Sequence, residues 1–248
     1  MSIRLNCDLG ESYGQWTMGT DEAILPFVDQ ASIACGFHAG DPMVLRRTLV
    51  LAKQHRVSVG AHPSYPDLVG FGRRSISCNS EEIIALMHYQ IAAIDGMAKS
   101  AGIEVEYVKP HGALYNDMMI NASVRGAIMS AVESYYRPIR LMVQATPQCD
   151  QLNIEAQDKG VELLFEGFAD RCYADDGTLL SRSEPEAVHS LEKMLAQVEQ
   201  LCDKGTVTTI SGKTLSLNID SLCVHGDNQN AVDAIAEIRQ RLNNSRSR

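Results

Sequence analysis

The regular alternation of short apolar runs with longer helical segments constrains the fold of this 248-residue chain more than any other feature. Seven short runs, rich in β-branched or other apolar residues and bounded by polar turns, are typical of strands. These predicted strands are Ile3–Cys7, Ala31–Cys35, Val57–Ala61, Val105–Val108, Leu141–Val143, Leu163–Phe165 and Leu222–Val224. Strands that alternate with helices along one chain form a parallel sheet covered by helices. A closed barrel and an open doubly wound sheet both fit this pattern.

The segments between the predicted strands carry helix-start signals. Asp41 followed by Pro42 is an N-cap with proline at the first helical position, and it predicts a helix over Met43–His55. Further helix starts are predicted at Ser80, Asn121, Thr146, Ser183 and Asp227. Each predicted helix except the last, which follows the final strand, lies between two strands, as a parallel sheet requires.

One segment, Thr206–Asn218, breaks the alternation. Two β-prone runs flank Ser211 and Gly212, which predicts an antiparallel hairpin outside the main sheet. The composition, with 45% hydrophobic and 21% charged residues, is that of an ordinary globular protein. Because neither a linker nor an internal repeat divides the chain, we predict a single domain over residues 1–248 with a hairpin excursion at 206–218.

Charge and cysteine content narrow the classes of function. A net charge of -9 disfavours binding to nucleic acid and docking on an anionic membrane. Met1–Leu5 runs directly into a predicted strand and no apolar run reaches membrane-spanning length, so neither a signal peptide nor a membrane span is expected. Seven scattered cysteines without a Cys-x-x-Cys pair do not form a disulfide framework, so we expect a reducing cytoplasm. Cys7, Cys35 and Cys223 lie in apolar runs and are expected to be small buried residues rather than nucleophiles.

Polar residues collect directly after the predicted strands. Four of the seven histidines occupy such positions, namely His38, His62, His111 and His225. They are accompanied by Asp8, Lys109, Glu166, Asp170, Arg171 and Asp227. In a parallel barrel the carboxyl ends of all strands emerge on one rim, where catalytic groups gather. Because unpaired buried charges are costly, packing alone does not explain this set, and we predict a functional cluster.

Histidines and carboxylates together suit either general acid–base catalysis or a divalent metal, for which Asp8 and His62 are candidate ligands. The sequence lacks His-Glu-x-x-His and Gly-x-Ser-x-Gly, the signatures of zinc proteases and of α/β-hydrolases. Gly212-Lys213-Thr214 lacks the remaining glycine of a phosphate-binding loop and lies in the predicted hairpin. The predicted helix N-termini near Asp41 and Asp227 favour a small anionic substrate at the rim.

Long motifs cover nearly the whole chain, at Asn6–Ser12, Ala34–Pro42, Gly60–Asp67, Gly70–Arg74, Val108–Asn116, Glu166–Arg171 and Val224–Asp227. In these motifs the chain resembles the LamB/YcsF family. The resemblance implies a seven-stranded parallel β/α barrel, a distorted TIM-like barrel of the type found in glycoside hydrolases and polysaccharide deacetylases.

The same resemblance implies one component of a three-subunit, ATP-dependent 5-oxoprolinase. Such an enzyme hydrolyses 5-oxo-L-proline to L-glutamate, coupled to hydrolysis of ATP to ADP and phosphate, and subunits B and C are the implied partners. The residues expected to be catalytic are Asp8, His38, His62, Lys109, His111, His225 and Asp227. Those expected to bind substrate are Asn6, Asp41, Glu166, Asp170 and Arg171. Two alternatives stay open: a stand-alone metal-dependent amide hydrolase of the deacetylase type, and a non-catalytic lactam-binding subunit.

Overall fold

The structure is a computed structural model that describes residues 3–182, 184–225 and 229–245. Seven strands form a closed barrel in the order β1-β2-β3-β4-β5-β6-β9, and every pair of neighbours is parallel. Their bounds are β1 Arg4–Leu9, β2 Gln30–Ala34, β3 Ser58–His62, β4 Val105–Val108, β5 Arg140–Gln144, β6 Leu163–Phe168 and β9 Ser221–Cys223. The predicted strands and the closed barrel are confirmed, and the open sheet is excluded.

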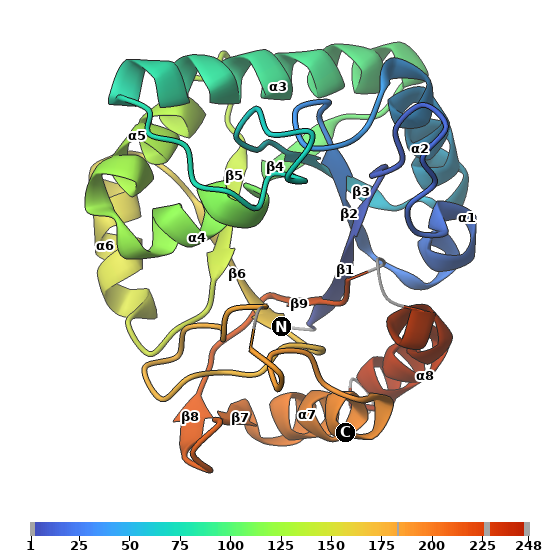
Figure 1. Ribbon diagram of the computed structural model, residues 1–248, viewed down its shortest axis with the longest axis vertical. Helices are drawn as coiled ribbons and strands as arrows, with labels where there is room; N and C mark the ends of the chain where they lie inside the picture. The colour runs from blue at the N-terminus through green and yellow to red at the C-terminus, as the bar shows by residue number, and fades with distance from the viewer. Residues whose placement is uncertain (1–2, 183, 226–228, 246–248) are drawn as a thin grey trace.

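Helices surround the ring of strands (Figure 1). Their bounds are α1 Asp21–Ile24, η1 Leu25–Phe27, α2 Pro42–His55, α3 Ser80–Ala101, α4 Gly112–Ile120, α5 Ala122–Glu133, α6 Cys149–Asp158, α7 Leu191–Lys204 and α8 Gln229–Ser245. The strands β7 Thr206–Thr208 and β8 Thr214–Ser216 pair antiparallel as the predicted hairpin, which projects outside the ring at the bottom of Figure 1. Among the described residues, no helix has both the length and the apolar character needed to cross a membrane.

Side-chain caps fix the starts of several helices. The Asp41 carboxylate accepts hydrogen bonds from the backbone nitrogens of Met43 at 2.8 Å and Val44 at 3.0 Å, as predicted for α2. Asn121 caps α5, which is also the predicted start. Helix α3 begins at Ser80, and its cap is the preceding residue, Asn79. These caps satisfy backbone N–H groups that have no partner within their own helix.

Two predicted helix starts are wrong. Helix α6 begins at Cys149, because Thr146 forms a turn in which its hydroxyl accepts from the Gln148 nitrogen at 3.2 Å. Helix α7 begins at Leu191, capped by Ser190, and not directly after Ser183, which itself lies outside the described residues. Helix α4 was not predicted, because no side chain caps its N-terminus.

The barrel interior is unusually polar near its rim. Along β1, Leu5, Cys7 and Leu9 belong to the main hydrophobic core, whereas the alternate residue Asn6 donates a hydrogen bond to the Ser221 hydroxyl at 2.7 Å. Alternation along the strand therefore sends apolar side chains toward the helices and polar side chains into the barrel. The polar interior continues upward into the rim, where the candidate site lies.

Gly60 on β3 leaves room for the ring of Tyr107 on β4. A Cβ atom at position 60 would lie 2.2 Å from Cε2 of Tyr107, whose buried hydroxyl is 3.2 Å from Oγ of Ser32. Because the ring is fully buried and cannot move away, we expect Gly60→Ala to lower the free energy of unfolding by about 1–3 kcal/mol. Denaturant unfolding measures this change.

Gly96 provides the matched control for that substitution. It lies on the exposed side of α3, and an added Cβ meets nothing within 4 Å. Alanine is the better helix former, so Gly96→Ala is expected to raise stability by up to ~1 kcal/mol. Equal losses at positions 60 and 96 would contradict the packing argument.

Candidate functional site

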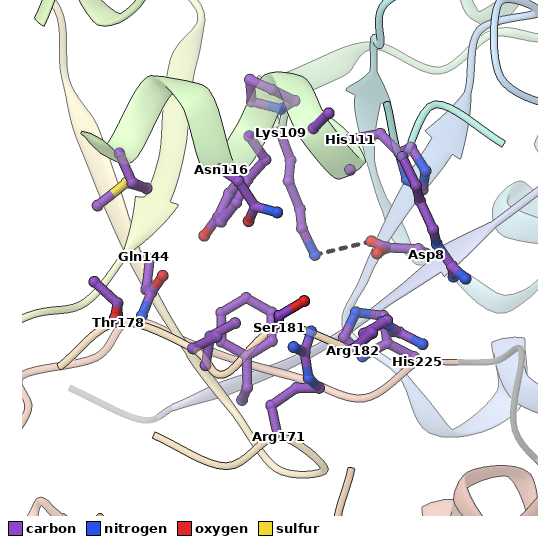
Figure 2. A pocket seen from close by; sticks show the side chains of 18 of the residues that line it. Asp8, Lys109, His111, Asn116, Gln144, Arg171, Thr178, Ser181, Arg182 and His225 are labelled. Carbon is purple, nitrogen blue, oxygen red and sulfur yellow. Dashed lines mark hydrogen bonds and ion pairs between the residues drawn. The ribbon is translucent and has the colours of Figure 1, made fainter. Parts of the chain in front are cut away.

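A cavity of about 510 Å³ opens at the carboxyl ends of the barrel strands. Figure 2 shows side chains from separate strands and loops converging on it, among them Asp8, Lys109, His111, Gln144, Arg171 and His225. The volume lies within the usual range for sites that bind small molecules. Residues predicted at the rim from separate segments are therefore brought together, as parallel strand order requires.

A buried ion cluster forms the floor of the cavity. The Lys109 ammonium lies 2.9 Å from Oδ1 of Asp8 and 3.0 Å from Oε2 of Glu166. It also contacts Oδ1 of Asn6 and Sγ of Cys223, each at 3.3 Å. Lys109 is only 3% exposed and Glu166 is fully buried. Two carboxylates thus hold one cation at the bottom of a site from which water is largely excluded.

The charges of this cluster follow from their surroundings. Burial alone would lower the pKa of Lys109, but Asp8, Cys223 and Glu166 together raise this pKa well above its ordinary value. Burial alone would raise the pKa of Asp8, but His62 and Lys109 hold it well below its usual range. At neutral pH the cavity floor therefore presents an ammonium beside an ionised carboxylate, both fixed in place before any ligand arrives.

His225 and Asp170 form a dyad beside the ion cluster, where His225 lies close to Asp8 and Cys223. Nδ1 of His225 donates to Oδ2 of Asp170 at 2.9 Å, and the imidazole stacks on Phe168 with ring centroids 5.9 Å apart. Asp170 is buried, which raises its pKa, but His225 and Arg182 bring that pKa below its ordinary value. An ionised carboxylate that engages Nδ1 leaves Nε2 to exchange protons, an arrangement typical of a general base.

Three histidines and one glutamate form a second cluster, here called the histidine cluster: Glu11, His38, His62 and His111. Nδ1 of His111 lies 2.9 Å from Nε2 of His62. Oε1 of Glu11 lies 3.4 Å from Nε2 of His38 and 3.6 Å from Nδ1 of His111. Each of the four side chains offers one ligand atom. These four atoms lie within 4.8 Å of one another, and such a set can hold a metal ion.

Two imidazoles of the histidine cluster are neutral. Burial and neighbouring imidazoles hold the pKa of His38 and of His111 well below the ordinary histidine value. Their rings stack in parallel with centroids 3.7 Å apart. If both rings were imidazolium ions, charge repulsion would disfavour this contact. Each therefore has one ring nitrogen with a lone pair.

Several predicted site residues lie behind the cavity wall. Asn6 and Glu166 contact Lys109 from below, Asp170 orients His225, and His38 lies beneath His111. Asp41 caps α2, and its second carboxylate oxygen accepts from the Gly14 nitrogen at 2.8 Å, so it does not line the cavity. Asp227 lies outside the described residues.

The structure adds residues that the sequence did not single out. Glu11 lies three positions after Asp8 in the motif Asn6–Ser12. Its place in that motif was the one sequence signal that could have identified it as a site residue. Cys223 is fully buried as predicted, but its sulfur contacts Lys109, and burial raises its pKa well above the ordinary thiol value. Arg73 and Arg182 join Arg171 at the cavity, from loops without a strand-end signal. The cavity is therefore more cationic than the overall charge suggests.

Comparisons with known proteins agree on one family. A profile described as the LamB/YcsF family matches residues 3–248. The 5-oxoprolinase A subunit from Vibrio cholerae serotype O1 is 50% identical over 242 residues, covering 97% of this chain and 98% of that protein. A protein of the same name from Pseudomonas fluorescens (strain Pf0-1) is 49% identical, covering 97% of each chain. The crystal structure of a lactam utilization protein from Thermus thermophilus superimposes with a TM-score of 0.90 at 36% identity, covering 99% of this chain and 97% of that one.

Proposed function

The chain belongs to the LamB/YcsF family, and we propose that it is the A subunit of an ATP-dependent 5-oxoprolinase, which hydrolyses 5-oxo-L-proline to L-glutamate. The observation that carries this proposal is the near-full-length likeness to proteins of that name. The site geometry supports it, since a small cavity unites a buried ammonium, a His–Asp dyad and several guanidinium groups.

The reaction has demands that these groups meet. A lactam is an amide, and amide resonance makes its carbon a poor electrophile. We propose that transfer of a phosphoryl group from ATP to the lactam oxygen activates the ring, releasing ADP. Water then adds to the ring carbon, the C–N bond breaks and the ring nitrogen takes up a proton, which leaves γ-glutamyl phosphate. A second water hydrolyses this acyl phosphate to L-glutamate and phosphate. The protein must supply a base, an acid and positive charge near oxygen.

His225 is the proposed base and acid. With Nδ1 committed to Asp170, its Nε2 removes the proton from the attacking water and returns a proton to the leaving nitrogen. Lys109 stabilises negative charge that develops on oxygen, and Asp8 and Glu166 hold Lys109 in place.

Guanidinium groups are the proposed recognition elements for the substrate carboxylate and the phosphoryl oxygens. Arg171 lines the cavity, and its side chain is fixed by hydrogen bonds to the carbonyl oxygens of Ala187 at 3.2 Å and Leu180 at 2.5 Å. Arg73 and Arg182 line the same cavity. Guanidinium groups match the geometry of carboxylate and phosphoryl oxygens.

Turnover is proposed to need subunits B and C. Gly212-Lys213-Thr214 lies at the β7–β8 hairpin, where Lys213 pairs with Asp175 at 2.8 Å, so it does not resemble a phosphate-binding loop. We propose that ATP binds in the assembled complex, in a reducing cytoplasm that matches seven free cysteines.

We predict that the isolated chain forms almost no glutamate from 5-oxoproline and ATP, and that adding subunits B and C restores turnover. Glutamate and ADP release, measured with the chain alone and with its partners, test this prediction. Full ATP-dependent turnover by the isolated chain would contradict it. ATP-independent ring opening by the chain alone would favour the stand-alone hydrolase, and wild-type turnover in His225→Ala would favour a non-catalytic role.

A further inference from the structure

We propose that the histidine cluster is a binding site for one first-row divalent transition metal, held by Nε2 of His38, Nε2 of His62, Nδ1 of His111 and a carboxylate oxygen of Glu11. The inference comes from the hydrogen bonds around the cluster and does not depend on the proposed reaction.

The hydrogen bonds of His62 and His111 fix which nitrogens carry protons. Nδ1 of His62 lies 2.7 Å from the carbonyl oxygen of Lys109, and Nε2 of His111 lies 2.9 Å from that of Phe71. Carbonyl oxygens only accept, so both of these nitrogens must donate. The remaining nitrogens, Nε2 of His62 and Nδ1 of His111, therefore direct lone pairs at each other across 2.9 Å. A cation between them, either a proton or a metal ion, is required to make this approach favourable.

His38 distinguishes the two cations. Oγ of Ser64 donates its proton to the carbonyl oxygen of Tyr65 at 2.8 Å, so it accepts from Nδ1 of His38 at 3.0 Å. Nε2 of His38 then carries a lone pair, points into the cluster and has no hydrogen-bond donor among the described residues, although His38 is only 1% exposed. A proton shared by His62 and His111 would leave this buried nitrogen unsatisfied, whereas a metal ion satisfies all three imidazoles at once.

The spacing of the donor atoms agrees with coordination. Bonds of about 2.1 Å place neighbouring ligand atoms about 3.0 Å apart at right angles and about 3.4 Å apart in a tetrahedron. Three of the separations in the cluster are 2.9, 3.4 and 3.6 Å, and all the ligand atoms lie within 4.8 Å of one another. Each imidazole is also oriented through its other nitrogen by an oxygen acceptor, the usual outer shell of a metal site.

The donor set indicates the class of metal. Three imidazole nitrogens and one carboxylate oxygen suit zinc, cobalt, nickel or iron(II) rather than magnesium or calcium, which prefer oxygen ligands. Glu11, His62 and His111 also line the cavity, so the ion would lie at its wall. There it would supply Lewis-acid chemistry to a bound oxygen.

Metal titration of chelator-treated, full-length protein tests the proposal without substrate. Co²⁺ and Zn²⁺ are the probes, followed by visible absorption, calorimetry and melting temperature. We expect one ion per chain, a raised melting temperature and an absorption spectrum that reports nitrogen ligation. His38→Ala should weaken affinity at least about a hundredfold, and Ser64→Ala, which removes only an outer partner, on the order of tenfold.

Two control variants locate the ion. His88, whose Nε2 lies 2.8 Å from the Ala131 carbonyl, lies outside the cluster, so His88→Ala should bind metal normally. His225 belongs to a second group of potential ligands with Asp8 and Cys223, and His225→Ala should also retain the ion. Loss of metal in His225→Ala with retention in His38→Ala would overturn the assignment. If His38→Ala fails to fold, Glu11→Gln takes its place. Binding of well below one ion per chain by the wild-type protein would refute the site.

Discussion

Asp8→Asn is expected to reduce turnover of the assembled complex at least about a hundredfold while leaving the fold intact. Oδ1 of Asp8 accepts from Lys109 at 2.9 Å and Oδ2 lies 3.4 Å from Nε2 of His62, so this carboxylate links the cavity floor to the histidine cluster. Asparagine keeps the size and one acceptor oxygen but removes the charge. Glu166 remains to balance Lys109, and the melting temperature should change little. Steady-state kinetics and thermal unfolding of the same preparation measure both quantities.

Asp95 offers a matched control for this substitution. Like Asp8, it is a buried carboxylate in an ion pair, 2.6 Å from Arg137. Arg137 also donates to the carbonyl oxygen of Val105 at the start of β4, so this pair lies at the opposite end of the barrel from the site. Asp95→Asn should therefore lower stability and leave turnover per folded molecule unchanged. If Asp8→Asn instead follows that pattern, the role of Asp8 is structural.

Lys109→Met is expected to lower the free energy of unfolding by about 3–5 kcal/mol at neutral pH, because it leaves two buried carboxylates without their cation. Turnover should also fall on the order of a thousandfold, because the ammonium that stabilises negative charge on the substrate oxygen is lost. Glu166 is fully buried and Asp8 only 7% exposed, so water solvates the two carboxylates poorly once the ammonium is lost. Urea unfolding and complex turnover measure the two effects.

The stability loss in Lys109→Met should depend on pH in a defined direction. Without the ammonium, burial and repulsion from Glu166 raise the carboxyl pKa of Asp8 above its unfolded value. A carboxyl whose folded pKa is raised contributes stability at low pH and loses it as the pH rises. The variant should therefore lose more stability at pH 8 than at pH 5. The double variant Lys109→Met with Glu166→Gln should recover much of the stability but not the turnover, and a single variant as stable as wild type at pH 8 would contradict the ion-cluster argument.

The sequence determined the elements and the end of the barrel at which the candidate site residues gather. Strand and helix positions follow from the local period of apolar residues, which packing against a sheet imposes on the sequence itself. His62, Lys109, His111 and His225 were identified because parallel strands end on one side, whatever the exact curvature of the sheet. Local signals were weaker at helix starts, where Thr146 forms a turn and not a cap.

Only the tertiary structure decided which rim residues face the cavity and which support them. Lys109 meets Asp8 and Cys223 across 101 and 114 residues of sequence, contacts that depend on closure of the barrel between β1 and β9. The same closure buries Glu166 beneath Lys109. Periodicity specifies which face of a strand is apolar, but strand tilt, closure and loop paths depend on packing among distant segments, and these set the distances on which ionisation and ligation depend.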